Sequence, residues 1–342
     1  MKRCKLSDLD SLFALISSKR ELYLPVDGTD GRAHYSAWHE GVELSQKTNT
    51  VRSAKDFFFP QSEDLVEFRL SGNSISISDI RTEKDDFVLF GVRACDARSF
   101  EILDRVFLCE PVDSFYASRR EHALIMTLAC NRPSETCFCS AFGIDAANPG
   151  GDIECRMDSE YLYLEARTDK GSTFMAELSN SLESCADDAA DDIIKLIQKR
   201  IAGLPIGELP LDEFGAGTTE KYFSDTAWKK LSESCLGCGS CTYTCPTCQC
   251  YDIKEFDTGK AIKRYRCWDS CMYSEFTKMS AGQPRPTQLE RFRQRFMHKL
   301  VYFPENNEGI FGCVGCGRCL IGCPISMNIV KVIRALGGKE DE

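Results

Sequence analysis

The sequence contains no run of about 18 apolar residues, the length that a helix needs to cross a bilayer. Its first twenty residues hold only the short apolar patch LFALI, which is too small for the hydrophobic region of a signal peptide. A Walker A motif is missing, and the Gly-Ala-Gly at 215–217 has neither a preceding strand nor a third glycine. We therefore expect a cytoplasmic protein without a membrane span and without its own site for NAD, FAD or a nucleotide.

Basic residues are scarce in the first two thirds of the chain. Residues 1–220 carry 24 Lys and Arg against 39 Asp and Glu, a net charge of −15, whereas residues 221–342 carry 18 against 13, a net charge of +5. The acidic front part argues against a general DNA- or RNA-binding protein. If the C-terminal part surrounds anionic metal clusters, those clusters explain its positive net charge without a bound nucleic acid.

Cysteine, by contrast, is abundant, with 20 residues. Because nothing supports secretion, these thiols belong to a reducing compartment, where clustered cysteines indicate metal binding or catalysis. Two stretches share the pattern Cys-x2-Cys-x2-Cys-x3-Cys-Pro: CLGCGSCTYTCP from residue 235 and CVGCGRCLIGCP from residue 313. This is the ligand spacing of two-cluster bacterial ferredoxins, in which the fourth cysteine of each motif binds the other [4Fe-4S] cluster.

The exchange of fourth ligands defines two predicted cluster sites. Site A consists of Cys235, Cys238, Cys241 and Cys323. Site B consists of Cys313, Cys316, Cys319 and Cys245. Zinc is the alternative, because it also binds Cys-x2-Cys pairs, but it needs only two such pairs and no third cysteine two residues further on. The sequence therefore favours two [4Fe-4S] clusters.

A third set of cysteines lies at the ends of two strand-like runs. The run 87–92 leads past Cys95 into a predicted helix, and the run 122–128 ends just before Cys130 and a Cys-rich loop. Site C consists of Cys95, Cys130, Cys137 and Cys139. We predict a third [4Fe-4S] cluster there. The alternative is that Cys95 and Cys130 are small buried hydrophobic residues.

Eight cysteines fall outside these sites. Four lie between the two motifs and either ligate a fourth cluster or pack as thiols around sites A and B: Cys248, Cys250, Cys267 and Cys271. A cluster with fewer than four protein ligands would leave one iron open to a disulfide or sulfur substrate. The remaining four fit no motif and receive no role: Cys4, Cys109, Cys155 and Cys185.

The expected fold class is α+β. Strand-like and helical patterns over residues 1–202 predict a mixed α/β domain that contains site C. Residues 203–220, rich in Gly and Pro, indicate a linker. Helical patterns fill the 68 positions from Cys245 to Cys313, so residues 221–342 are predicted to form an all-helical two-cluster ferredoxin domain.

The segment 285–303 is the clearest helix of that domain. One face is apolar, and the other is basic, with Arg291, Arg295, His298 and Lys299. Such a face is usually solvated. The alternatives here are that it docks an acidic neighbour or shields the negative charge of the clusters.

Several segments together resemble a known family. They are FFFP at 57–60, FGVRACDARSFEILDRVF, CNRPSETCFC, CWDSC, RFRQRFMHKLVY and the two cluster motifs. They resemble the iron–sulfur beta subunits of cytosolic sulfhydrogenases and also the iron–sulfur electron-transfer subunit of anaerobic sulfite reductase. The likeness runs from about residue 57 to residue 332. It implies cluster ligation by the eight cysteines of sites A and B, and it supports site C, whose cysteines fall in shared segments.

The resemblance also implies a function. Such subunits transfer electrons within a multi-subunit, NAD(P)H-linked oxidoreductase. The implied partners are a flavoprotein with FAD and a [2Fe-2S] cluster that binds NAD(P)H, and a catalytic redox subunit. The latter would be a NiFe hydrogenase, a sirohaem sulfite reductase or a heterodisulfide-reductase-like module. We expect no catalytic residue in this chain itself. Two alternatives are a stand-alone reductase acting at an open cluster iron, and a binding module with redox-silent metal sites.

Overall fold

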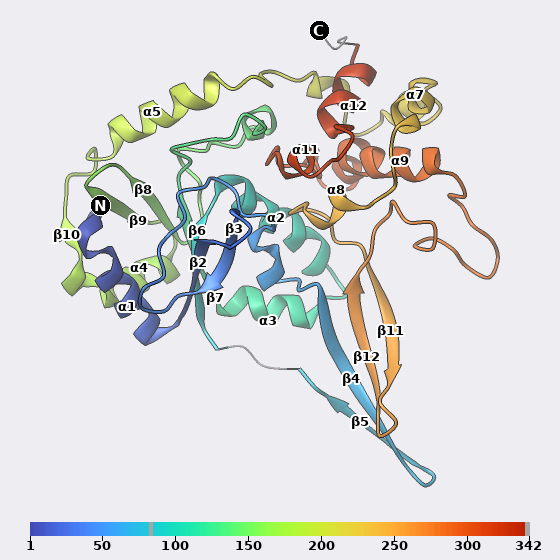
Figure 1. Cartoon of the computed structure of the whole chain (residues 1–342), viewed down its shortest axis with the longest axis horizontal. Coiled ribbons are helices and arrows are strands. Elements are labelled where there is room, and N and C mark those ends of the chain that lie inside the picture. The colour runs from blue at the N-terminus through green and yellow to red at the C-terminus, as the bar shows by residue number, and fades with distance from the viewer. Residues whose placement is uncertain (82–84, 339–342) are drawn as a thin grey trace.

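The computed structural model describes residues 1–81 and 85–338 (Figure 1). An eight-stranded sheet with strand order β10-β1-β9-β8-β7-β6-β2-β3 forms the centre of the N-terminal part. Strands β2, β6, β7 and β8 are parallel to one another, and the outer strands are antiparallel. The strands are β1 (Lys2–Lys5), β2 (Glu21–Asp27), β3 (Ala33–Ala37), β6 (Phe87–Val92), β7 (Ala123–Leu128), β8 (Ile153–Met157), β9 (Tyr161–Ala166) and β10 (Glu183–Ser184).

Strands β6 and β7 lie in the middle of this sheet. Their sequences, FVLFGV and ALIMTL, are apolar almost throughout, and every residue is buried. This is typical of parallel strands that are covered on both faces. Helix α1 (Leu9–Lys19) and helix α4 (Asp169–Glu177) pack on one face, and α2 (Ala94–Phe107) and α3 (Ser114–His122) cover the other. The carboxyl ends of both strands therefore open onto a common edge.

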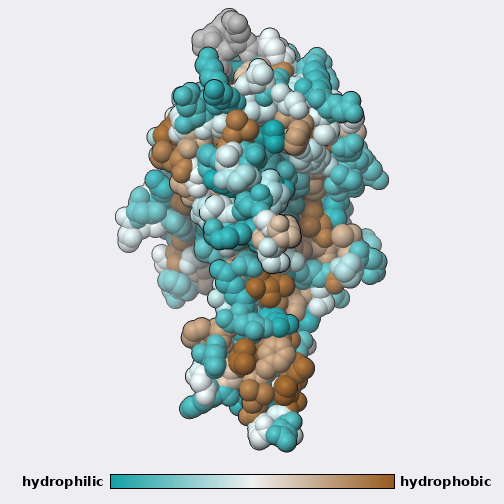
Figure 2. Space-filling view, turned by 90° about the vertical axis from the view of Figure 1, so that its right-hand side faces the viewer, coloured by the Kyte–Doolittle hydropathy of each residue, from teal (hydrophilic) through white to brown (hydrophobic). Residues whose placement is uncertain are grey.

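A second, four-stranded antiparallel sheet projects from the body as a narrow arm (Figures 1 and 2). Its order is β11-β12-β4-β5, with β4 (Ser62–Ser71), β5 (Ser74–Asp79), β11 (Tyr251–Asp257) and β12 (Ile262–Trp268). Figure 2 shows apolar side chains near its free end, and Leu70, Ile75, Ile77 and Phe256 are exposed there. The arm joins two segments that are almost 200 residues apart in the chain.

The prediction of an all-helical domain over residues 221–342 is therefore wrong, because this range contains β11 and β12. Both strands are rich in charge, so they lack the apolar runs that mark buried strands. Cross-strand ion pairs stabilise them instead, such as Arg264 with Glu255 and Lys263 with Asp64 of β4. Since β4 belongs to residues 1–202, the two predicted domains share a sheet, and their division remains a prediction.

The rest of the C-terminal part is helical. Helix α9 begins at a capping box formed by Thr287 and Glu290, and continues through a π-helical turn, His298–Tyr302, into α10. The predicted linker contributes Leu209, Leu211 and Phe214 to the apolar core of this part. The helices are α5 (Asp191–Ala202), α6 (Thr219–Phe223), α7 (Ala227–Glu233), α8 (Ser240–Tyr243), α9 (Gln288–Met297), α10 (Phe303–Asn306), α11 (Arg318–Ile321) and α12 (Ile329–Leu336). Within the described residues, every helix is too short or too polar to span a membrane.

Candidate metal centres

The two cysteine motifs adopt matching loops. Each contains a glycine with φ of +75°, Gly239 and Gly317, followed directly by a one-turn helix, α8 or α11. This left-handed conformation is accessible to glycine and strained for residues with a side chain. The two one-turn helices contact one another, so the motifs face each other across a small common core.

The structure brings the four cysteines of site A together. They line one cavity, and Cys323 reaches it from the second motif, as the sequence predicts. Apolar side chains complete the wall, among them Met272, Phe292 and Phe296. Four thiols around a largely apolar cavity fit a [4Fe-4S] cluster, which needs one thiolate per iron. Cys238 is exposed, so this site reaches the molecular surface.

The cysteines of site B also lie close together. Burial raises the pKa of Cys313 to about 12, and the neighbouring charges of Cys245 and Cys316 add to this increase. Burial likewise raises the pKa of Cys319, which is affected by the other three thiols of the site. Cys245 differs, because a hydrogen bond with Cys248 and the nearby charge of Lys299 lower its pKa. Metal coordination would deprotonate all four thiols. The donor set therefore fits a cluster with four thiolate ligands.

Site C lies at the carboxyl ends of β6 and β7. Cys95 is in the first turn of α2, directly after β6, and Cys130 follows β7. The loop after Cys130 returns Cys137 and Cys139 to the same place, and all four thiols are buried. Burial raises the pKa of Cys137 to about 11 and that of Cys139 to about 12; the charge of Cys130 adds to both, and that of Cys137 adds to the second. The predicted tetrad is thus assembled in space.

Sites B and C are in direct contact. The backbone N–H of Phe138 donates to the carbonyl of Gly315 over 2.8 Å. A Cβ atom on Gly315 would lie 2.4 Å from the Phe138 carbonyl, so only glycine permits this approach. The charge of Cys316 acts on three thiols of site C, and Asn49 donates to the Cys316 carbonyl over 2.9 Å.

A buried ion pair fixes the same junction. Arg318, in the second motif, donates to both carboxylate oxygens of Asp96 over 2.6 and 2.7 Å. Asp96 lies in the first turn of α2, next to Cys95. Both side chains are almost fully buried, so the bidentate pair ties the site B loop to the helix that carries a site C ligand.

Three buried cations surround sites A and B. Arg295 Nη1 donates to Cys248 Sγ over 3.3 Å and Arg295 Nη2 to the Cys241 carbonyl over 2.6 Å. Lys299 donates to Thr247 and to the Gly312 carbonyl, both over 2.7 Å. Burial acts to lower the pKa of Lys299, but the negative charges of Cys245 and Cys248 outweigh it and raise this pKa. Of the alternatives for the basic face of 285–303, these contacts favour shielding of cluster charge.

The third cation, Lys55, is missing from the sequence-based prediction. Its ammonium donates to the carbonyls of Cys245 and Cys248 over 3.1 and 2.9 Å and lies 3.6 Å from the ring centre of Trp268. Among the described residues, neither Lys55 nor Arg295 nor Lys299 forms an ion pair with a carboxylate. Buried cations without carboxylate partners are costly, and anionic clusters would offset that cost. No local motif marks Lys55, which lies 190 positions before Cys245.

The four additional cysteines separate into two groups. Cys248, Cys250 and Cys271 line one cavity beside Arg295 and Lys299. Cys267 is instead on β12, where its neighbouring charges are Lys254, Asp252 and Asp269. Within the described residues, no group of three or more His, Cys, Asp or Glu side chains is arranged to hold a single metal ion.

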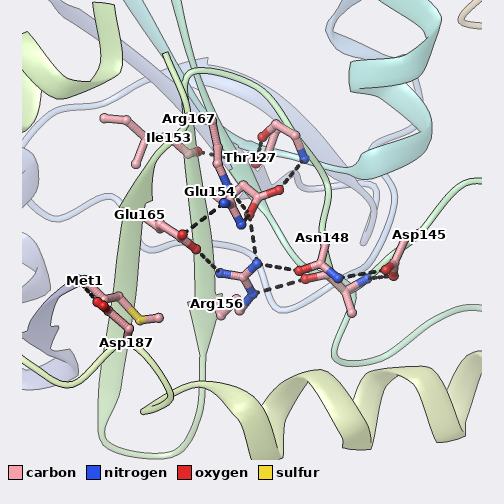
Figure 3. A network of polar contacts seen from close by, with 12 residues as sticks. Met1, Thr127, Asp145, Asn148, Ile153, Glu154, Arg156, Glu165, Arg167 and Asp187 are labelled. Carbon is pink, nitrogen blue, oxygen red and sulfur yellow. Dashed lines mark hydrogen bonds and ion pairs between the residues drawn. The ribbon is translucent and has the colours of Figure 1, made fainter. Parts of the chain in front are cut away.

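A polar network around Arg156 holds the loop that contains Ala147 and Asn148 (Figure 3). Arg156 donates to the Ala147 carbonyl, to Asn148 and to Glu154 over 3.1, 2.7 and 2.8 Å. The preceding residue, Ala146, accepts a hydrogen bond from the Cys130 backbone N–H over 3.0 Å. Arg156 therefore fixes the loop that positions one ligand of site C.

Replacing Arg156 by alanine is expected to lower the free energy of unfolding by about 1–3 kcal/mol, because the Ala147 carbonyl and Asn148 lose their buried donor, whereas Glu154 keeps its ion pair with Arg167. Anaerobic urea unfolding measures this change. The matched control is Arg98→Ala, which removes an exposed ion pair with Glu101 and should cost at most about 1 kcal/mol. Equal losses in the two variants would contradict a supporting role for the buried network.

These cysteine groups and the shielding cations define an iron–sulfur protein, and comparison with known proteins agrees. The 4Fe-4S dicluster domain family matches residues 234–327, which include every cysteine of sites A and B. The chain is 34% identical over 292 residues to sulfhydrogenase 2 subunit beta of Pyrococcus furiosus, covering 84% of this chain and 83% of that protein. No solved structure matches. The chain belongs to the family of sulfhydrogenase beta subunits and is an iron–sulfur electron-transfer subunit.

Proposed function

We propose that this protein relays single electrons between an FAD-containing, NAD(P)H-binding flavoprotein and a catalytic redox subunit. In this proposal sites A, B and C each bind one [4Fe-4S] cluster, and each cluster accepts and passes on one electron at a time. The observation that carries the proposal is the direct contact between the loops of sites B and C. Arg295 links sites A and B, because it donates to the backbone carbonyl of Cys241 in site A and is affected by the charge of Cys245 in site B. Three adjacent sites form a continuous path.

The two ends of this path differ in exposure. Site C is buried at its contact with the second motif, whereas site A reaches the surface through Cys238. Leu236 and Ile321 are exposed beside the motif cysteines, at 65% and 60%. Apolar residues beside a surface cluster suit contact with a redox partner. We assign one electron-exchange surface to site A.

The cationic side chains would tune the relay. A reduced cluster carries one more negative charge than an oxidised one, so Arg295, Lys299 and Lys55 favour the reduced state and raise the reduction potential. The hydrogen bond from Arg295 to Cys248 acts in the same direction on any cluster bound by that thiolate.

The catalytic partner that we favour is a hydrogenase of the sulfhydrogenase type, because the relative is a sulfhydrogenase beta subunit. A sirohaem sulfite reductase and a heterodisulfide-reductase-like module are the other partners implied by the sequence resemblance.

The relay predicts how the protein is reduced. The purified chain should stay oxidised when NAD(P)H is added alone and become reduced once the flavoprotein partner is supplied. EPR of frozen samples measures this, and dithionite gives the fully reduced reference. Reduction by NAD(P)H without the flavoprotein would indicate a stand-alone reductase, and failure of reduction with the flavoprotein present would contradict the assigned donor.

A further inference from the structure

One cavity outside sites A, B and C is lined by three thiols and an imidazole. Its walls include Cys248, Cys250, Cys271 and His298. The three cysteines come from two separate segments, the loop after the first motif and the turn after β12. Such convergence brings four potential metal ligands to one place.

The helix that supplies the imidazole is irregular at this point. Helix α9 ends at Met297, and His298 begins the π-helical turn. Single π-helical turns inside α-helices are rare overall, but those that occur often lie at functional sites. They change the direction in which side chains project. Arg295, His298 and Lys299 all face this cavity.

The buried positive charges around the cavity favour binding of an anion there. Arg295 and Lys299 are buried there without a carboxylate ion pair among the described residues, and the Nε atom of Arg295 is buried without a hydrogen-bond partner. The same guanidinium donates to Cys248 Sγ over 3.3 Å, the geometry of an N–H group that supports a metal-bound thiolate. A cluster with thiolate ligands would supply the missing negative charge.

We propose that this cavity holds a fourth [4Fe-4S] cluster, ligated by Cys248, Cys250, Cys271 and His298. We name it site D. The proposal rests on the proposed function, since it extends the same relay. Three cysteines and one histidine match the four irons of a cubane, and replacing a thiolate ligand by a neutral histidine makes the cluster less negative. Cys267, which the sequence grouped with these cysteines, is not a ligand in this proposal.

Site D also has a defined place in the relay. Cys248 lies against Cys245 of site B, and the charge of Cys271 acts on Cys241 of site A. Site D therefore lies beside both and offers electrons a second route between the surface cluster and the interior.

The test compares iron and acid-labile sulfide in the full chain, produced and purified without oxygen. We expect about sixteen iron atoms per chain in the wild type, the content of four cubanes, and about four fewer in Cys250→Ala. Cys267→Ala is the matched control, because it removes a cysteine from the neighbouring strand and should keep the full iron content. Unchanged iron in Cys250→Ala, or loss of four atoms in Cys267→Ala, would overturn site D.

The histidine is tested separately, by EPR and Mössbauer spectroscopy of His298→Cys. This variant supplies a thiolate in place of the imidazole, so it should keep the wild-type iron content and show altered spectra for one cluster only. Identical spectra would remove His298 from the ligand set. If the wild-type protein contains zinc and Cys250→Ala loses it, site D is a zinc site and not an iron–sulfur cluster. Cys238→Ala in the same series distinguishes the two proposals, because it should lose iron from site A whether or not site D exists.

Discussion

Replacing Cys238 by alanine should remove about four iron atoms per chain and reduce electron flow through the assembled complex to the rate seen without this protein. The thiol belongs to site A, which the proposed relay uses as its surface cluster. Because Cys238 is exposed and touches little of the core, its loss should leave the fold and the other clusters in place. The iron of the other clusters should therefore stay bound and remain reducible by dithionite.

Iron analysis and NAD(P)H-driven turnover of the complex measure the two effects. Cys109→Ala is the matched control, since Cys109 is also exposed and belongs to no site. It should keep both iron and turnover at the wild-type level. Unchanged turnover in Cys238→Ala despite lost iron would remove site A from the electron path.

Replacing Cys139 by alanine should remove the cluster of site C, again about four iron atoms per chain. The effect on stability should be larger than for Cys238, because site C is buried at its contact with site B. Loss of the cluster leaves three thiols and an unfilled space between the N-terminal sheet and the second motif. We expect the chain to remain folded around the eight-stranded sheet but to unfold at lower urea concentration.

Cys155 provides the control for that experiment. It is fully buried in β8 and belongs to no site, so Cys155→Ala creates a cavity and should cost about 1–3 kcal/mol while keeping all iron. Comparison of the two variants separates cluster loss from ordinary loss of packing. Full iron content in Cys139→Ala would show that site C is a structural group of buried thiols.

Sites A and B can be predicted from the sequence because the information that defines them is local. The spacing within each motif would place three thiols around one cluster, and the known exchange of the fourth ligand groups Cys323 with the first motif, beside which the structure also places it. Site C is harder to predict, since its cysteines come from three segments. It is predictable because the parallel strands β6 and β7 are each followed by a cysteine and their carboxyl ends share one edge of the sheet.

Other features depend on contacts that no local pattern encodes. The charged strand β12 is stabilised by pairing with β4, which lies almost 200 residues earlier, and β11 pairs in turn with β12. Lys55 reaches the first motif across a similar separation. The approach of sites B and C requires Gly315 against the Phe138 carbonyl, a constraint visible only once both loops are folded. Sequence reasoning thus finds ligands more readily than the residues that shield or separate the clusters.

The central claim is that this chain carries several redox-active [4Fe-4S] clusters. EPR of the anaerobically purified, dithionite-reduced full chain tests it most directly. The relay predicts overlapping signals from several reduced clusters, broadened by their magnetic interaction because the sites lie side by side. A protein that remains EPR-silent after reduction and contains zinc in place of iron would contradict the electron-transfer function.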